Sequence, residues 1–281
     1  MGNEPMSAVL LLFVCATSPR ALSGTQAIEK TRAILKAFGE PAPFRLQGLG
    51  AQDIGGTPRW DVKLSGPRGV TYEGWLGGPE GELNLWRGKE GDAIGLGPAH
   101  PLTDPSENKR VQDWLSKIGA RAPNRLQSLT ASKDNHQANA EVAILRNGYP
   151  FVSYPHYGYS IVFTLPDHRF LALRGMEIPP EVDGIPPRLD EKAALDALQR
   201  IWDTEIGGPA VRNNHWKRNW FRLTGKPELG YYLQKGHPKA NLAWRFTFMN
   251  MRDVGYAIQG GSDAMLIDAV TGRRIRTEMV P

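Results

Sequence analysis

The segment LAWRF at residues 242–246, followed by LIDAVTGR at residues 266–273, decides the fold of the C-terminal third of this chain. The first reads as an aromatic-rich strand, and the second as a strand that ends in an Asp-Ala-x-Thr-Gly turn. In such a turn the Asp268 carboxylate can accept hydrogen bonds from backbone N–H groups, and Gly272 can adopt the positive φ that the turn needs. We therefore expect structural roles for Asp268 and Gly272, and we place Trp244 in the core on the inner face of a sheet.

Three other motifs accompany these two strands: RNGYPF at residues 146–151, RLDEKA at 188–193 and PELGYY at 227–232. Taken together, the motifs resemble the PepSY and fungalysin/thermolysin-propeptide group of secreted domains. The resemblance implies small α+β units and, from the propeptide members, an inhibitory or chaperone-like role towards a peptidase. Because no peptidase domain follows in this sequence, we expect such a role to be exerted in trans on a separate protein.

Helix-like and strand-like patterns alternate three times after residue 24. Apolar residues at helical spacing predict helices at residues 26–38, 105–118 and 190–204. The second has Asp104 as its N-cap, and Glu107 is placed to complete a capping box. Each helix precedes several short runs of alternating apolar and polar residues, which indicate sheets with one buried face. This pattern predicts an α+β fold of repeated units, each a helix packed on an antiparallel β-sheet, and the resemblance implies that the units are PepSY-like.

The N-terminal apolar run AVLLLFVCAT at residues 8–17 has the length of a signal-peptide core and is too short to span a bilayer. Ala21 and Ser23 place small residues at the −3 and −1 positions of a cleavage site before Gly24. We therefore expect a secreted, periplasmic or cell-envelope protein without a lipid anchor or stable membrane insertion.

Proline-containing segments near residues 101 and 186 suggest boundaries between the units. The expected organisation is a signal peptide at 1–23, an α+β unit at 24–101, and PepSY-like units at 102–185 and 186–281.

Composition and motif spacing give no support for catalysis. The single cysteine, Cys15, lies in the segment that signal cleavage would remove, so the mature chain would have no thiol. None of the six histidines forms a His-x-x-x-His or His-Glu-x-x-His pattern, and the glycine-rich turns lack the spacing of phosphate or dinucleotide sites. The net charge of +5 comes from dispersed basic residues. We expect a non-enzymatic protein with no catalytic residues, no cofactor, no metal and no nucleic-acid partner.

Two aromatic segments are candidate partner-binding sites. The segment NNHWKRNWFR at residues 213–222 interleaves cations with aromatic rings, a composition suited to stacking and to anionic partners. The segment YPHYGY at 154–159 presents three tyrosines, as contact loops often do. For each segment the alternative is that the aromatic rings fill the core. The candidate contact residues are His215, Trp216, Lys217, Arg218, Arg222, Tyr154, Tyr157 and Tyr159.

The sequence thus favours a secreted, non-enzymatic protein that binds a protein or peptide, with a secreted peptidase as the partner that the resemblance implies. An exposed sheet edge or an aromatic loop can engage such a partner. The alternative is an envelope module that binds a small molecule or polysaccharide in a sheet–helix cleft. An enzyme with scattered acidic catalytic residues is a third hypothesis, which no sequence pattern supports.

Overall fold

The computed structural model describes residues 21–88, 99–132, 136–152, 157–206, 219–234, 236–253 and 258–279. It describes the backbone alone at residues 99, 205–206, 219–222, 249–253, 258–262 and 277–279. The helices are α1 (Gly24–Ala37), α2 (Pro105–Lys117) and α3 (Glu191–Ile201), with short helical turns at Pro67–Gly69 and Trp202–Ile206. The strands are β1 (Arg45–Ile54), β2 (Thr57–Ser65), β3 (Thr71–Gly77), β4 (Glu82–Arg87), β5 (Ala99–Pro101), β6 (Asn124–Ser132), β7 (Gln137–Ile144), β8 (Gly158–Thr164), β9 (Phe170–Met176), β10 (Asn219–Leu223), β11 (Glu228–Tyr232), β12 (Asn241–Asp253), β13 (Ile258–Asp268) and β14 (Arg274–Met279).

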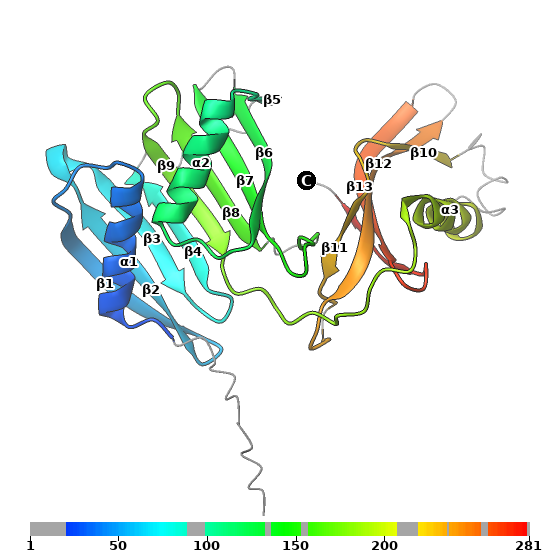
Figure 1. Cartoon of the computed structure of the whole chain (residues 1–281), viewed down its shortest axis with the longest axis horizontal. Helices are drawn as coiled ribbons and strands as arrows, with labels where there is room; N and C mark the ends of the chain where they lie inside the picture. The colour runs from blue at the N-terminus through cyan, green and yellow to red at the C-terminus, as the bar shows by residue number, and fades with distance from the viewer. Residues whose placement is uncertain are drawn as a thin grey trace, which may run out of the picture.

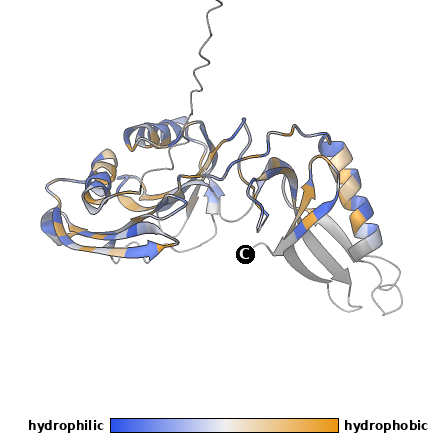
Figure 2. Ribbon diagram, turned by 90° about the horizontal axis from the view of Figure 1, so that it is seen from below, coloured by the Kyte–Doolittle hydropathy of each residue, from blue (hydrophilic) through white to orange (hydrophobic). Residues whose placement is uncertain are grey.

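Nine of these strands form one antiparallel sheet in the order β1-β2-β3-β4-β9-β8-β7-β6-β5. Strands β4 and β9 join its two halves, with Leu85 opposite Leu173. Figures 1 and 2 show α1 and α2 on the same face of this sheet. The fold is therefore α+β, as the sequence predicts, and one sheet takes strands from both sides of the expected boundary at residue 101.

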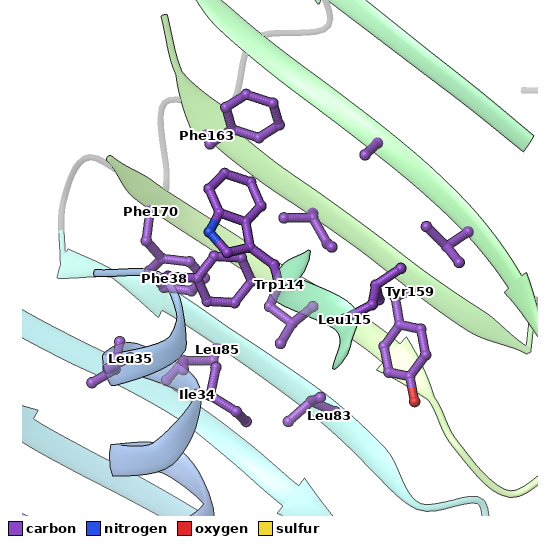
Figure 3. Close-up of a cluster of buried hydrophobic side chains, with 14 of the residues drawn as sticks. Ile34, Leu35, Phe38, Leu83, Leu85, Trp114, Leu115, Tyr159, Phe163 and Phe170 are labelled. Atoms are coloured by element: carbon purple, nitrogen blue, oxygen red, sulfur yellow. The ribbon is translucent and has the colours of Figure 1, made fainter. Parts of the chain in front are cut away.

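A single apolar core lies between the two helices and the large sheet. The ring of Phe38, which caps α1, lies 4.9 Å from the ring of Trp114 in α2, measured between centroids. Trp114 in turn lies 5.0 Å from Phe163, and Phe38 lies 4.9 Å from Phe170 (Figure 3). Aromatic contacts at these distances add to the free energy gained by burying the rings. The contacts also tie α1 to α2 and to strands β8 and β9.

Features of the first helix and strand recur 80 residues later. Helix α1 is followed by Gly39 and helix α2 by Gly119, and both glycines have a positive φ. The first strand after each helix, β1 or β6, contains a bulge at the matching position, after Leu46 and after Leu126. The four buried positions of each helix match as well: Ala27, Thr31, Ile34 and Leu35 in α1, and Glu107, Val111, Trp114 and Leu115 in α2.

The C-terminal third forms a smaller sheet with its own core. Its order is β10-β12-β13-β14, with β11 also paired to β12. Helix α3 covers one face (Figure 1). Trp244 of β12 is 8% exposed, and its Nε1 donates a 3.0 Å hydrogen bond to the Leu189 carbonyl just before α3. The Trp244 side chain thus joins the strand to the start of the helix.

The Asp-Ala-x-Thr-Gly turn after β13 has the hydrogen bonds that its sequence indicates. Asp268 Oδ1 accepts from the backbone N–H groups of Val270 at 2.9 Å and Thr271 at 2.6 Å. Gly272 has a φ of 71° and donates its N–H to the Asp268 carbonyl at 3.0 Å. These contacts close the turn before β14.

Two segments connect the large sheet to the small one. The backbone at Val152, between β7 and β8, lies beside β11: its N–H donates to the Tyr231 carbonyl at 3.0 Å, and the Tyr231 N–H donates to Pro150 at 2.7 Å. In the link after β9, Asp183 and Glu181 make similar backbone contacts with Ala240. The small sheet is therefore held to the large one by main-chain pairing as well as by side chains.

The helix starts include one difference from the sequence-based expectation. Asp104 caps α2 by accepting from the Ser106 N–H at 2.8 Å, but Glu107 does not complete a capping box. Glu107 is instead buried, with Oε1 at 2.8 Å from Nε2 of His168, a residue distant in sequence. A capping box is present at α1, between Ser23 and Gln26.

Residues of the expected signal peptide contribute to the start of this fold. Besides the Ser23 cap, the carbonyl of Leu22 accepts a 2.6 Å hydrogen bond from Trp60 Nε1. Cleavage after Ser23 would remove both interactions. No helix in the described ranges is long and apolar enough to cross a membrane.

Candidate functional site

Six of the eight predicted contact residues lie outside the described side chains. Tyr154 and the run from His215 to Arg218 lie outside the described residues. Arg222 is described only as backbone, in β10 opposite Met249 of β12. The predicted partner-binding segment at residues 213–222 thus lies outside the described side chains.

Tyr157 and Tyr159 lie inside the protein, at 4% and 2% exposed. The Tyr157 ring packs 4.9 Å from Phe151 in the core of the smaller sheet, and its hydroxyl donates to Glu80 Oε1 at 3.2 Å. The Tyr159 hydroxyl donates to Glu177 Oε1 at 3.3 Å. Burial, reinforced by the nearby carboxylate in each case, raises the pKa of both tyrosines above the ordinary value. These two side chains are packing groups in this structure, in place of the exposed contacts expected from the sequence.

Strand β1 is an exposed edge of the large sheet. Among the described strands it pairs only with β2. Most of its residues are exposed, including Leu46 at 44% and Leu49 at 41%. Because an edge strand has one row of backbone N–H and C=O groups without a neighbouring strand, it is a natural site for strand addition.

The two leucines of β1 point to the face that carries the helices. Leu46 is opposite Leu64, and Leu49 is opposite Val62, and both partners are buried in the core. A Cβ placed on Gly24, the first residue of α1, would lie 3.0 Å from Leu49 Cδ2 and 3.1 Å from Trp60. The leucines thus extend the core outwards along the flank of α1. The sequence did not single them out, because strand periodicity does not tell an edge strand from a central one.

A cavity of about 420 Å³ opens on the same sheet face, between the start of α1, the end of α2 and the β3–β4 turn. Its charged walls come from Lys30, Arg121 and Glu177. Lys30 and Glu177 form an ion pair, and the backbone N–H of Arg121 donates to Tyr159 Oη at 2.9 Å. Three separate elements therefore place these charges, which explains why no sequence motif indicated the cavity.

In the described part of the chain, no group of three or more His, Cys, Asp or Glu side chains could hold a metal ion. The pair formed by buried Glu107 and partly buried His168 lies beside Arg110, whose Nε is 3.4 Å from Glu107 Oε2. These contacts hold the start of α2 to the β8–β9 turn.

No model of a protein family matches the chain, and no curated protein matches it. A solved structure does: the C-terminal domain of YpeB from Bacillus megaterium, with a TM-score of 0.53 over 93% of this chain and 99% of that one. The chain shares the fold of that domain. At 10% identity the likeness extends to the fold alone.

Proposed function

We propose that this protein is a non-enzymatic binding protein, exported to the envelope or beyond, which captures an extended segment of a partner protein at strand β1. The observation that carries the proposal is the exposed ten-residue edge of β1, with Leu46 and Leu49 on one face. The partner adds a strand antiparallel or parallel to β1, and its apolar side chains cover the two leucines. A secreted peptidase is the partner class that the PepSY-like motifs favour.

Main-chain pairing and apolar contact each have a separate role in this proposal. The backbone of β1 supplies hydrogen bonds whose pattern is independent of the partner's sequence. Leu46 and Leu49 give the binding its specificity, because they favour a partner strand with large apolar residues on the same face. Long exposed edge strands are uncommon in monomeric proteins because they promote aggregation, and β1 has charged residues only near its ends, at Arg45 and Asp53. Both points favour a function for the edge.

We further propose that the large sheet consists of two PepSY-like units joined through β4 and β9, with the smaller sheet as a third. The matches at an 80-residue spacing between α1–β1 and α2–β6 support this arrangement. Under this arrangement β1 and β6 are equivalent strands. The β6 edge is covered by β5, whereas the β1 edge has no described strand beside it.

The test combines a peptide selection with hydrogen exchange. A peptide that binds the immobilised protein is selected from a random displayed library, and its affinity is measured by fluorescence anisotropy. Replacing Leu46 and Leu49 together by Lys should weaken binding about tenfold or more, because the apolar contact is lost and charge is added to the edge. Ile185→Lys is the matched control, since Ile185 is also a large exposed apolar residue, at 47%, and lies in the link before α3.

Hydrogen exchange separates strand addition from other binding modes. A bound strand should slow exchange of β1 amides, and the effect should be absent in the Leu46→Lys/Leu49→Lys variant. Binding that leaves β1 exchange unchanged, or that Ile185→Lys weakens equally, would contradict the proposal.

A small-molecule function is the second candidate, and the 420 Å³ cavity favours it. Volumes of this size are common for small-ligand sites. None of the described residues that line the cavity is aromatic. The stacking expected for a polysaccharide site is therefore not supported there, which leaves small polar ligands.

A further inference from the structure

Two tyrosine-centred networks lie at corresponding places in the two halves of the large sheet. Tyr72 is the second residue of β3, and Tyr159 is the second residue of β8. In each half the tyrosine lies near two charged residues. One follows the helix, α1 or α2, and the other lies at the end of the fourth strand of that half, β4 or β9.

The network of the first half is closed. Glu40, directly after Gly39, accepts a hydrogen bond from the Tyr72 hydroxyl. Arg87, the last residue of β4, places Nη1 at 2.9 Å from one Glu40 carboxylate oxygen and 3.2 Å from the other. The side chains of Glu40 and Arg87 are 5% and 12% exposed. The charge of a buried carboxylate is thus neutralised by an arginine of the same half, and a tyrosine of that half donates a hydrogen bond to it.

The second half reverses the positions of the charges. The residue after the helix is now the cation, Arg121, and the residue just past the fourth strand is the carboxylate, Glu177. The tyrosine hydroxyl again donates to the carboxylate. However, Glu177 forms its ion pair with Lys30, which belongs to α1 of the other half.

Because Lys30 neutralises Glu177, the positive charge of Arg121 has no carboxylate among the cavity-lining residues to balance it. Its guanidinium makes no ion pair or hydrogen bond with any residue in the described ranges, and Arg121 lines the 420 Å³ cavity. Lys30, Arg121 and Glu177 together give the cavity one net positive charge. The first half has no net charge at the matching place, since Glu40 and Arg87 cancel.

We propose that this cavity binds a small carboxylate monoanion, whose carboxylate pairs with the Arg121 guanidinium as Glu40 pairs with Arg87. The guanidinium fork matches the planar carboxylate and can bind it through two hydrogen bonds. Pro79 and Ile178 supply apolar wall for a short aliphatic tail. This site is distinct from strand β1, so its test does not depend on the outcome of peptide binding.

The experiment uses butyrate as the carboxylate probe and follows the backbone amide of Arg121 by NMR at constant ionic strength. Butyrate should shift this amide saturably, since the amide donates to Tyr159 Oη inside the same network. Arg121→Gln should weaken binding about tenfold or more, because the charge-assisted hydrogen bonds are lost. In that variant the amides of the neighbouring residues Gly119 and Glu177 are followed as well.

Arg125→Gln is the matched control, because Arg125 is an exposed arginine on the nearby strand β6 and the substitution changes the net charge equally. It should leave butyrate affinity unchanged. Lys30→Gln should weaken butyrate binding, since Glu177 is then free to pair with Arg121. Equal shifts with butyramide or with chloride, or equal losses in Arg121→Gln and Arg125→Gln, would overturn the proposal.

Discussion

Tyr157 and Tyr159 show how burial decides the role of a residue that looks like a contact group in sequence. A tyrosine in a run such as YPHYGY suits a binding loop and a core equally well, because its ring is apolar and its hydroxyl is polar. The partners that settle the matter, Glu80 and Glu177, are 77 and 18 residues away. Local sequence therefore could not place these side chains.

The same two tyrosines predict a pH dependence of stability. Because burial raises their folded pKa, they stay protonated in the folded state while unfolded tyrosines ionise near pH 10. Their stabilising effect is complete below about pH 10 and is lost as the pH rises towards the folded pKa. Each can contribute a loss of up to about 1.4 kcal/mol per pH unit in that range.

The measurement is the free energy of unfolding in urea between pH 9 and pH 11.5. The Tyr157→Phe/Tyr159→Phe variant should have a shallower decline than the unmodified protein, even if it is less stable at pH 9. Parallel declines for the two proteins would show that these hydroxyls titrate alike in the folded and unfolded states.

Glu107 gives the opposite lesson about local signals. Its spacing from Asp104 matches a capping box, yet its carboxylate contacts His168 across the fold. The capping box of α1 pairs Gln26 with Ser23, the last residue of the expected signal peptide. Capping motifs thus predicted where helices begin, but long-range contacts decided what each acidic side chain does.

At the scale of elements, the three helices and most strands could be predicted from sequence. Helix periodicity, caps and strand alternation are local, and α1, α2 and α3 lie within a few residues of their expected positions. The alternating runs predicted a strand at residues 44–49, whereas β1 extends to Ile54, and they predicted no strand at β5 or β14. Strand β1 has exposed residues on both faces, so its sequence lacks the alternation that marks a half-buried strand.

The start of α1 leads to a prediction about the N-terminus. A protein that begins at Gly24 lacks the Ser23 cap and the Leu22 carbonyl bonded to Trp60, whereas one that begins at Ala21 keeps both. The shorter protein should be less stable by about 1–3 kcal/mol, from the lost cap and the unpaired indole N–H. Urea denaturation of the two proteins measures the difference, and equal midpoints would show that the cap contributes nothing.

At the scale of the whole molecule, pairing between β4 and β9 is the feature that sequence could not supply. These strands are more than 80 residues apart, and each has the ordinary alternation of a sheet strand. Nothing local indicates that they pair with each other. The consequence is a core that α1 and α2 share across the expected boundary at residue 101, while the smaller sheet has a separate core with α3.

This arrangement predicts how the molecule unfolds. Leu85 of β4 is fully buried at the joint with β9, so Leu85→Ala should cost about 2–5 kcal/mol. Because α1 and α2 pack on one core, the substitution should lower the protection of amides in both helices by a similar amount in native-state hydrogen exchange. Leu198→Ala in α3 is the control: it removes an equally buried leucine from the smaller core and should lower protection in α3 while sparing α1 and α2. If Leu85→Ala lowered protection in α1 alone, the two halves of the large sheet would be independent folding units, and the β4–β9 pairing would not couple them.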